Sequence, residues 1–141
     1  MNVGIVGYGW VAGAHIDALN SIDGVQVTAV CSSRPQNEDE LSKKHGSPIK
    51  AFQELGEMLS LDDIEVISIC SYPGQHKEHA IAAAGAGKHL ILEKPLALSI
   101  EDCSEIRSAV EEANVRTCVC FECRFSSQFL ATKSVIDDGL L

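Results

Sequence analysis

The stretch VGIVGYGWVA, residues 3–12, decides the fold of this 141-residue chain. Its apolar start, residues 3–6, is typical of a buried strand. Gly7, Gly9 and Ala12 follow at the spacing of the Gly-x-Gly-x-x-Ala fingerprint, which turns a strand directly into a helix. We therefore expect this loop and the following helix N-terminus to bind the phosphates of a dinucleotide. The alternative is that the glycines serve turn geometry alone.

Apolar runs alternate with helical patterns along the rest of the chain. The runs predicted to be strands are residues 3–6, 25–31, 49–52, 66–70, 89–92 and 115–121. Several are uniformly apolar, which is typical of parallel strands that are buried on both faces. Pro35 predicts the first turn of one intervening helix, and Ser99 and Ser126 are predicted to cap two others. The sequence thus predicts an α/β fold, a doubly wound, mostly parallel sheet of the Rossmann type.

The composition disfavours several classes of partner. The net charge is −9, from 20 acidic and 11 basic residues, so nucleic acid and anionic membranes are disfavoured. No apolar run approaches the roughly 20 residues that span a bilayer. The N-terminus lacks the basic segment of a secretory signal. We expect a soluble cytoplasmic protein that binds a small molecule.

The six cysteines are expected to be reduced thiols, because no secretory signal precedes them. Cys118 and Cys120 lie two apart in a predicted strand, so they share a face and are expected to pack as small core residues. A metal or redox site around Cys118, Cys120 and Cys123 is the alternative. A zinc site needs a second ligand pair at recognisable spacing, and none is evident, so no metal is expected.

The residues after the second predicted strand bear on the choice of cofactor. An acid at this place commonly binds the ribose 2′-hydroxyl of NAD. Here the sequence reads Ser32-Ser33-Arg34, and two hydroxyls with a guanidinium suit a 2′-phosphate. This favours NADP over NAD. The alternative is an ordinary loop with Arg34 in solvent.

The predicted strand 89–92 runs directly into Glu93, Lys94 and Pro95. If a dinucleotide crosses the sheet edge, Lys94 lies at the floor of a reaction site. Glu93 is then placed to orient Lys94, and Pro95 fixes the direction of the backbone. The alternative is that these charges simply meet water at the end of a strand.

Glu93-Lys94-Pro95-Leu96-Ala97, preceded by Gly87-Lys88-His89, resembles the signature of the Gfo/Idh/MocA oxidoreductases. Other motifs follow the order of that family along essentially the whole chain. They are Gly7-x-Gly9-x-x-Ala12 with His15, Ser71-Tyr72-Pro73-Gly74-Gln75-His76, Cys123-Arg124-Phe125 and the final residues 136–141. Tyr72 departs from the proline usual in the family, and Ser32 departs from a common acid.

The resemblance implies an NAD(P)-dependent dehydrogenase or reductase that moves a hydride between nicotinamide and a sugar, polyol or related hydroxy or keto substrate. It gives the catalytic role to Lys94. The residues expected to contact the cofactor are Gly7, Tyr8, Gly9, Trp10, Val11, Ala12, Ser32, Ser33, Arg34, Cys70, Ser71, Tyr72, Pro73, His76, Glu93, Lys94 and Arg124. For His76 a purely structural place at a helix start is the alternative. Surface or packing roles are expected for His15, His45, His79 and His89.

The resemblance also bears on domain organisation. Members of the family continue into a second α/β domain that supplies most of the substrate pocket and the oligomer interface. We expect residues 1–123 to form the dinucleotide-binding domain and residues 124–141 to begin that second domain, in a homo-oligomeric protein. The alternative is a non-catalytic module that binds or senses NADP(H). The retained Glu93-Lys94-Pro95 favours the enzyme, because a sensor has no need of a reactive lysine.

Overall fold

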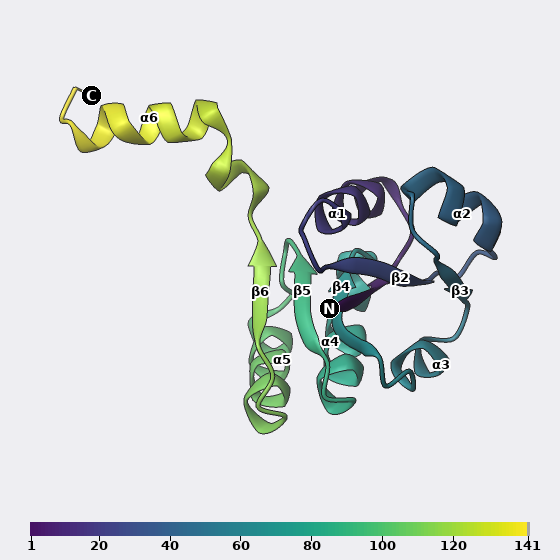
Figure 1. Cartoon of the computed structure of the whole chain (residues 1–141). Helices are drawn as coiled ribbons and strands as arrows, with labels where there is room; N and C mark the ends of the chain where they lie inside the picture. Colours follow the sequence, from purple (N-terminus) through teal and green to yellow (C-terminus); the bar gives the residue numbers. More distant parts are fainter. Residues whose placement is uncertain (141) are drawn as a thin grey trace.

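The computed structural model describes residues 1–140, which form a parallel α/β sheet domain and a C-terminal helix (Figure 1). The strands are β1 (Asn2–Val6), β2 (Gln26–Cys31), β3 (Lys50–Phe52), β4 (Ile64–Ile69), β5 (His89–Glu93) and β6 (Thr117–Cys120). The α-helices are α1 (Trp10–Asn20), α2 (Glu38–His45), α3 (Leu55–Leu59), α4 (His76–Gly85), α5 (Ile100–Glu112) and α6 (Ser127–Asp137). Two short 3-10 helices are η1 (Pro73–Gln75) and η2 (Glu122–Phe125). Within residues 1–140 no helix combines the length and the apolar character needed to cross a membrane.

The six strands pair in parallel in the order β3-β2-β1-β4-β5-β6. β1 and β4 are neighbours at the centre, so the chain reverses its direction of travel across the sheet between them. Doubly wound dinucleotide-binding folds share this order, and their ligands lie beyond the carboxyl ends of the strands at such a reversal. The predicted fold class is therefore confirmed.

Helices cover both faces of the central strands, which explains the uniformly apolar runs. On one face, Val3 and Ile5 of β1 are fully buried together with Ile16 of α1. On the other face, Ile67 of β4 and Ala83 of α4 belong to a second core that also takes in α3 and α5. Figure 1 shows α1 and α2 on one side of the sheet and α3, α4 and α5 on the other. The two cores hold the strand ends in fixed positions.

The edge strand β6 departs from this pattern. Cys118 is exposed and Cys120 is only partly buried, so the prediction that both pack in the core is wrong for Cys118 and holds only partly for Cys120. The register pairs Cys118 with Ile91 and Cys120 with Glu93, which places these side chains on the face that carries α1. α1 and α2 lie toward the other half of the sheet, leaving this face of β6 open (Figure 1).

Two of the three predicted helix starts are observed, and one lies elsewhere. The predicted helix at Pro35 begins instead at Glu38, because the Asn37 side chain accepts the backbone N–H of Glu40 and fixes the N-terminus there. The Ser99 and Ser126 caps of α5 and α6 are confirmed.

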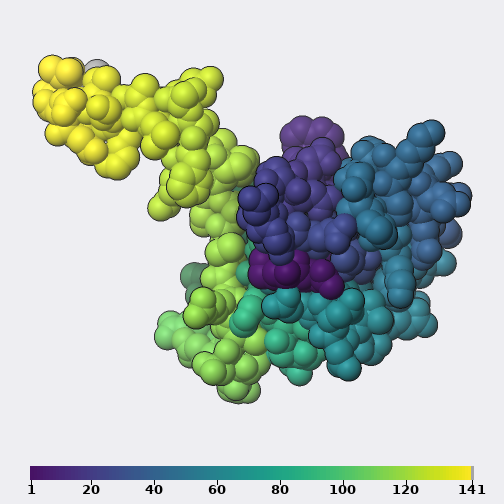
Figure 2. All heavy atoms as spheres, viewed as in Figure 1, coloured from purple at the N-terminus to yellow at the C-terminus, as the bar shows by residue number. Residues whose placement is uncertain are grey.

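α6 stands apart from the sheet, as the space-filling view shows (Figure 2). No residue of α6 from Ser127 to Asp137 is buried. Its apolar side chains, among them Phe129 and Leu130, are instead exposed. Leu141, the last residue of the predicted second-domain segment, lies outside the described residues.

Candidate dinucleotide-binding site

Four loops leave the carboxyl ends of parallel strands and therefore meet along one edge of the sheet. They begin after β1, β2, β4 and β5. These loops, with the helix starts that follow them and the last residue of β5, contain every residue predicted to contact a cofactor except Arg124. The fold thus brings together side chains that are up to about 90 residues apart in the sequence.

Gly7 lies where the loops after β1 and β4 touch. Its φ is +88°, and a Cβ added there would lie 2.6 Å from both the backbone N and the Cα of Ser71. The Gly7 N–H donates to the carbonyl of Cys31, which ties this loop to the end of β2. Both the left-handed backbone and the close approach therefore require glycine here.

The N-terminus of α1 has the features of an anion site. Gly9 precedes the helix and provides no side-chain cap, and the first turn carries no acidic residue. Nothing within 4 Å would obstruct a Cβ at Gly9, so its backbone faces open space. Ala12 is fully buried against the sheet, and Trp10 is 98% exposed beside the helix start. The uncapped N–H groups and the positive end of the helix dipole are suited to phosphate.

Tyr8 lies in the same loop, but its side chain points away from the helix N-terminus. Its hydroxyl is hydrogen-bonded to Nε2 of buried His45 at 2.9 Å and accepts a hydrogen bond from Lys44 Nζ at 3.0 Å. His45 Nδ1 lies 2.9 Å from an Asp17 carboxylate oxygen. Tyr8 therefore anchors the loop between α1 and α2, and only its backbone faces the phosphate site.

Ser32, Ser33 and Arg34 follow β2 as predicted. Ser32 is buried, and its N–H donates to the carbonyl of Phe52. The Ser32 hydroxyl accepts the backbone N–H of Arg34 at 3.3 Å, which shapes the turn. Ser33 and Arg34 are exposed. Among the described residues no acidic side chain pairs with the Arg34 guanidinium, so it remains available to an anion.

The end of β5 carries a hydrogen-bonded chain that reaches across the sheet. Glu93 is buried, and its Oε1 lies 2.9 Å from Nε2 of His15 in α1. His15 Nδ1 lies 2.8 Å from the hydroxyl of Ser68, which is fully buried in β4. The second oxygen of Glu93 accepts the backbone N–H of Lys94 at 3.1 Å. α1, β4 and β5 are thereby joined at the point where Lys94 begins.

A second histidine holds the other side of the same turn. His76 is fully buried, with Nδ1 2.8 Å from the carbonyl of Pro95 and Nε2 3.1 Å from the carbonyl of Ser71. Lys94 itself is exposed, and no partner for its Nζ occurs within residues 1–140. The backbone of Lys94 is thus held on both sides while its ammonium group is free. His76 braces two loops and does not line an open surface.

The remaining predicted residues of the loop after β4 differ in exposure. Tyr72 is 82% exposed, and the Ser71 hydroxyl is hydrogen-bonded to Nδ1 of His79. Burial lowers the pKa of His79. Burial also raises the pKa of the Cys70 thiol to about 12, so Cys70 is a neutral packing group at neutral pH.

Cys120 completes a group of polar side chains beside Glu93. Its Sγ, a ring nitrogen of His15 and a Glu93 oxygen all lie within 4.8 Å of one another. Partial burial raises the pKa of the Cys120 thiol to about 11, with further contributions from Cys118 and from the carboxylates of Glu93 and Glu122.

Arg124 lies in η2, beyond the carboxyl end of β6, with its guanidinium 5.8 Å from the centre of the Phe121 ring. Arg124 is exposed, and Val11 and Pro73 are partly exposed. The approach of Arg124 to a cofactor stays a prediction.

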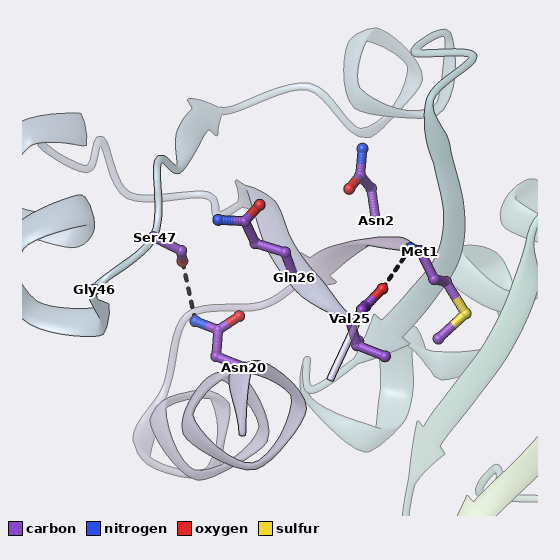
Figure 3. A pocket seen from close by; sticks show the side chains of 8 residues that line it. Met1, Asn2, Asn20, Val25, Gln26, Gly46 and Ser47 are labelled. Atoms are coloured by element: carbon purple, nitrogen blue, oxygen red, sulfur yellow. Dashed lines mark hydrogen bonds between the residues drawn. The ribbon is translucent and has the colours of Figure 1, made fainter. Parts of the chain in front are cut away.

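A separate hollow of about 350 Å³ lies at the opposite, amino-terminal edge of the sheet (Figure 3). Met1, Asn2, Asn20, Gln26 and Ser47 are among its lining residues. The Asn20 amide donates to the Ser47 hydroxyl there, and the terminal ammonium donates to the Gly24 carbonyl. The hollow is therefore distant from every predicted site residue, which leaves the open carboxyl edge as the candidate site.

His15 and Ser68 are the site residues that sequence reasoning missed. His15 occurs in the motif that follows the glycine fingerprint, but its pairing with Glu93 spans 78 residues and becomes visible only once α1 packs on the sheet and its side chain reaches the end of β5. For Ser68 the sequence does contain a signal, because this polar residue interrupts the apolar run of β4.

The strand order, the glycine turn and the uncapped α1 N-terminus together define a dinucleotide-binding domain of the Rossmann class. The model of the oxidoreductase family GFO_IDH_MocA, described as an NAD-binding Rossmann fold, matches residues 1–121. The chain therefore belongs to the Gfo/Idh/MocA oxidoreductase family, as its motifs predicted, and is an NAD(P)-binding domain.

Relatives with assigned activities are dehydrogenases. The chain is 34% identical over 134 residues to glucose-6-phosphate 3-dehydrogenase of Bacillus subtilis, covering 95% of this chain and 37% of that protein. It is 30% identical to the NADP(+)-dependent scyllo-inositol 2-dehydrogenase of the same organism, over 100% of this chain and 38% of the relative. A scyllo-inositol dehydrogenase from Lactobacillus casei, solved with NAD(H) and scyllo-inositol, is 28% identical with a TM-score of 0.85, over 99% and 41% of the two chains. The chain thus spans about two fifths of the length of these relatives.

Proposed function

We propose that this chain is the cofactor-binding domain of an NADP-preferring dehydrogenase or reductase that acts on a sugar, polyol or related hydroxy or keto compound. The observation that carries the proposal is the Glu93-Lys94 turn, held by two histidines at the same sheet edge as the uncapped α1 N-terminus. The relatives that are named dehydrogenases support an enzyme over a sensing module.

The residues at the sheet edge fit a dinucleotide. Backbone N–H groups of residues 9–12 would hold the pyrophosphate, because Gly9 faces open space and the helix start is uncapped. The loop at Ser71 and Tyr72 and the turn at Glu93 would border the nicotinamide half. When bound, the cofactor supplies hydride transfer at nicotinamide C4.

We assign the 2′-phosphate of NADP to Ser33 and Arg34. Arg34 offers an unpaired guanidinium, which binds phosphate through a charge-assisted fork, and no carboxylate follows β2 to accept a ribose hydroxyl. Buried Ser32 shapes the turn through its bond to the Arg34 N–H and so contributes indirectly.

Lys94 would act on the substrate oxygen. Its charged Nζ would stabilise a developing alkoxide, and its neutral form would accept the hydroxyl proton. Glu93 fixes the Lys94 backbone, and His76 fixes Pro95, so the side chain emerges from a rigid turn. The substrate pocket and the homo-oligomer interface would come from a second domain, which residues 124–141 begin.

Calorimetric titration of the chain with NADP and with NAD tests the cofactor assignment. We expect NADP to bind at least tenfold more tightly, a difference of about 1.4 kcal/mol. Arg34→Ala should abolish that preference, whereas Arg107→Ala on distant α5 should leave it intact. Tighter binding of NAD would refute the 2′-phosphate assignment.

The catalytic assignment needs a longer protein that carries the second domain. There, Lys94→Ala should lower kcat by about 10²-fold or more. NADP affinity should fall far less, because the phosphates are held elsewhere. A Lys94→Ala protein that retains its kcat would refute the role of Lys94 without affecting the binding assignment.

A further inference from the structure

Three potential metal ligands from three different elements converge at the end of β5. His15 comes from α1, Glu93 from β5 and Cys120 from β6. The β5–β6 register pairs Glu93 with Cys120, so both side chains lie on the face of the sheet that α1 crosses. As a result, a His15 ring nitrogen, a carboxylate oxygen and the thiol sulfur lie within 4.8 Å of one another.

Two of these ligands are already oriented by partners behind them. His15 Nδ1 lies 2.8 Å from the hydroxyl of fully buried Ser68, and Glu93 Oε2 accepts the Lys94 N–H. Metal-binding histidines characteristically donate their second ring nitrogen to such a partner, which fixes the tautomer and the ring plane. With Nδ1 and Oε2 engaged in this way, His15 Nε2 and Glu93 Oε1 are the atoms left to bind a cation beside Cys120.

The ligand set selects a class of cation. Nitrogen, carboxylate oxygen and thiolate together suit Zn²⁺ and similar borderline cations, whereas Mg²⁺ and Ca²⁺ prefer oxygen alone. One carboxylate and one thiolate balance a double positive charge. Ligand bonds of about 2.0–2.3 Å place tetrahedral ligand atoms about 3.3–3.8 Å apart. Since no pair of these atoms is more than 4.8 Å apart, no pair has to close by more than about 1.5 Å. His15 Nε2 and Glu93 Oε1, now 2.9 Å apart, have to separate by about 0.4 Å.

An approach path also exists. Glu93 and His15 are almost buried, with side chains 10% and 12% exposed. Cys120 is more accessible, and neighbouring Cys118 is exposed on the uncovered face of β6. A cation can therefore reach the group from that side without opening the core.

We infer that His15, Glu93 and Cys120 form a three-ligand site for a thiophilic divalent cation such as Zn²⁺, with a fourth position open to water. On binding, Nε2 coordinates the cation and the remaining ring proton sits on Nδ1, which donates a hydrogen bond to the Ser68 hydroxyl. The Cys120 thiol loses its proton to solvent, so one proton is released for each cation bound. This site is separate from the α1 phosphate site, and its test needs no nucleotide.

The probe is Co²⁺ added to the reduced 141-residue chain, because cobalt bound by a thiolate gives a near-ultraviolet charge-transfer band. We expect one equivalent to produce this band, together with visible bands typical of four-coordinate cobalt. Zn²⁺ should displace the Co²⁺ and abolish both sets of bands. The absence of a band in the unmodified chain would overturn the inference.

Matched variants identify the ligands. Cys120→Ser should remove the band, whereas Cys118→Ser, two residues away on the same strand and more exposed, should retain it. His15→Gln and Glu93→Gln should each weaken Co²⁺ affinity by more than about tenfold, and Ser68→Ala by about 10- to 100-fold. Circular dichroism would establish that each variant is folded. If the band survives Cys120→Ser or is lost in Cys118→Ser, the cation binds at surface thiols and the inference is wrong.

Discussion

Residues 1–121 and residues 122–140 use similar amino acids in opposite ways. In the first region apolar side chains from strands and helices meet in two cores, and Ile5, Ile16 and Ile67 are fully buried. In the second, α6 presents Phe129, Leu130 and other apolar residues to solvent and buries none. Apolar content alone therefore does not make a core. A second layer must cover it, and the sheet supplies that layer only to the first region.

The largest expected contrast is between two isoleucines. Ile67→Ala should lower the free energy of unfolding by about 2–5 kcal/mol, because Ile67 is fully buried between β4 and the helices that cover it. Ile136→Ala in α6 should change it by less than about 0.5 kcal/mol, since that side chain is 56% exposed. Urea unfolding of both variants measures the two changes in the free energy of unfolding. Equal decreases in that free energy would mean that α6 is packed as firmly as the core.

Two glycines with positive φ give the next contrast. Gly7→Ala should cost about 1–3 kcal/mol through backbone strain and should also abolish nucleotide binding, because its Cβ collides with the Ser71 backbone. Gly139 has a φ of +69° but nothing within 4 Å of an added Cβ. Gly139→Ala is strained by the same positive φ, but Gly139 follows α6, which buries none of its residues, so the change should leave both global unfolding and NADP titration unchanged. A Gly7→Ala chain that binds NADP normally would contradict the contact between the two loops.

A smaller effect concerns association. The exposed apolar residues of α6 and η2, including Phe125, Phe129, Leu130 and Val135, should cause reversible self-association at high concentration. The double change Phe129→Ser and Leu130→Ser should reduce the weight-average mass measured by sedimentation equilibrium without altering the midpoint of urea unfolding. A chain that sediments as a monomer at every concentration would show that this surface is inert.

Thiol reactivity compares the buried centre of the sheet with the exposed thiols at and beyond its edge, with the least disturbance to the fold. Cys118 and Cys123 are exposed, so iodoacetamide should label them readily at pH 8. Cys70 is buried with a pKa of about 12, so only about one thiol in 10⁴ is a thiolate at that pH. Its labelling should be more than about 100-fold slower and should accelerate as the pH rises toward 12. Peptide mass spectrometry follows each site, and rapid labelling of Cys70 would mean that the sheet centre opens.

Much of the fold could be predicted because local signals and tertiary structure agree. The apolar runs, the glycine fingerprint and the caps at Ser99 and Ser126 each depend on near neighbours in the sequence. The misplaced start at Pro35 reflects competition between two nearby start signals, of which Asn37 prevailed through its hydrogen bond to Glu40.

The parts that could not be predicted depend on which strands become neighbours. The exposure of Cys118 follows from the place of β6 at an uncovered sheet edge. The contact of His15 with Glu93 and the brace from His76 to Pro95 require a helix to cross a particular strand end. Neither has a periodic signal in the sequence.

Amide hydrogen exchange with and without NADP tests most directly whether the sheet edge of residues 1–121 binds the cofactor. We predict increased protection in residues 7–12, 32–34, 71–76 and 93–95, with no change in α6 (Ser127–Asp137). Protection that instead appears in α6, or around the amino-edge hollow lined by Met1, Gln26 and Ser47, would contradict the account.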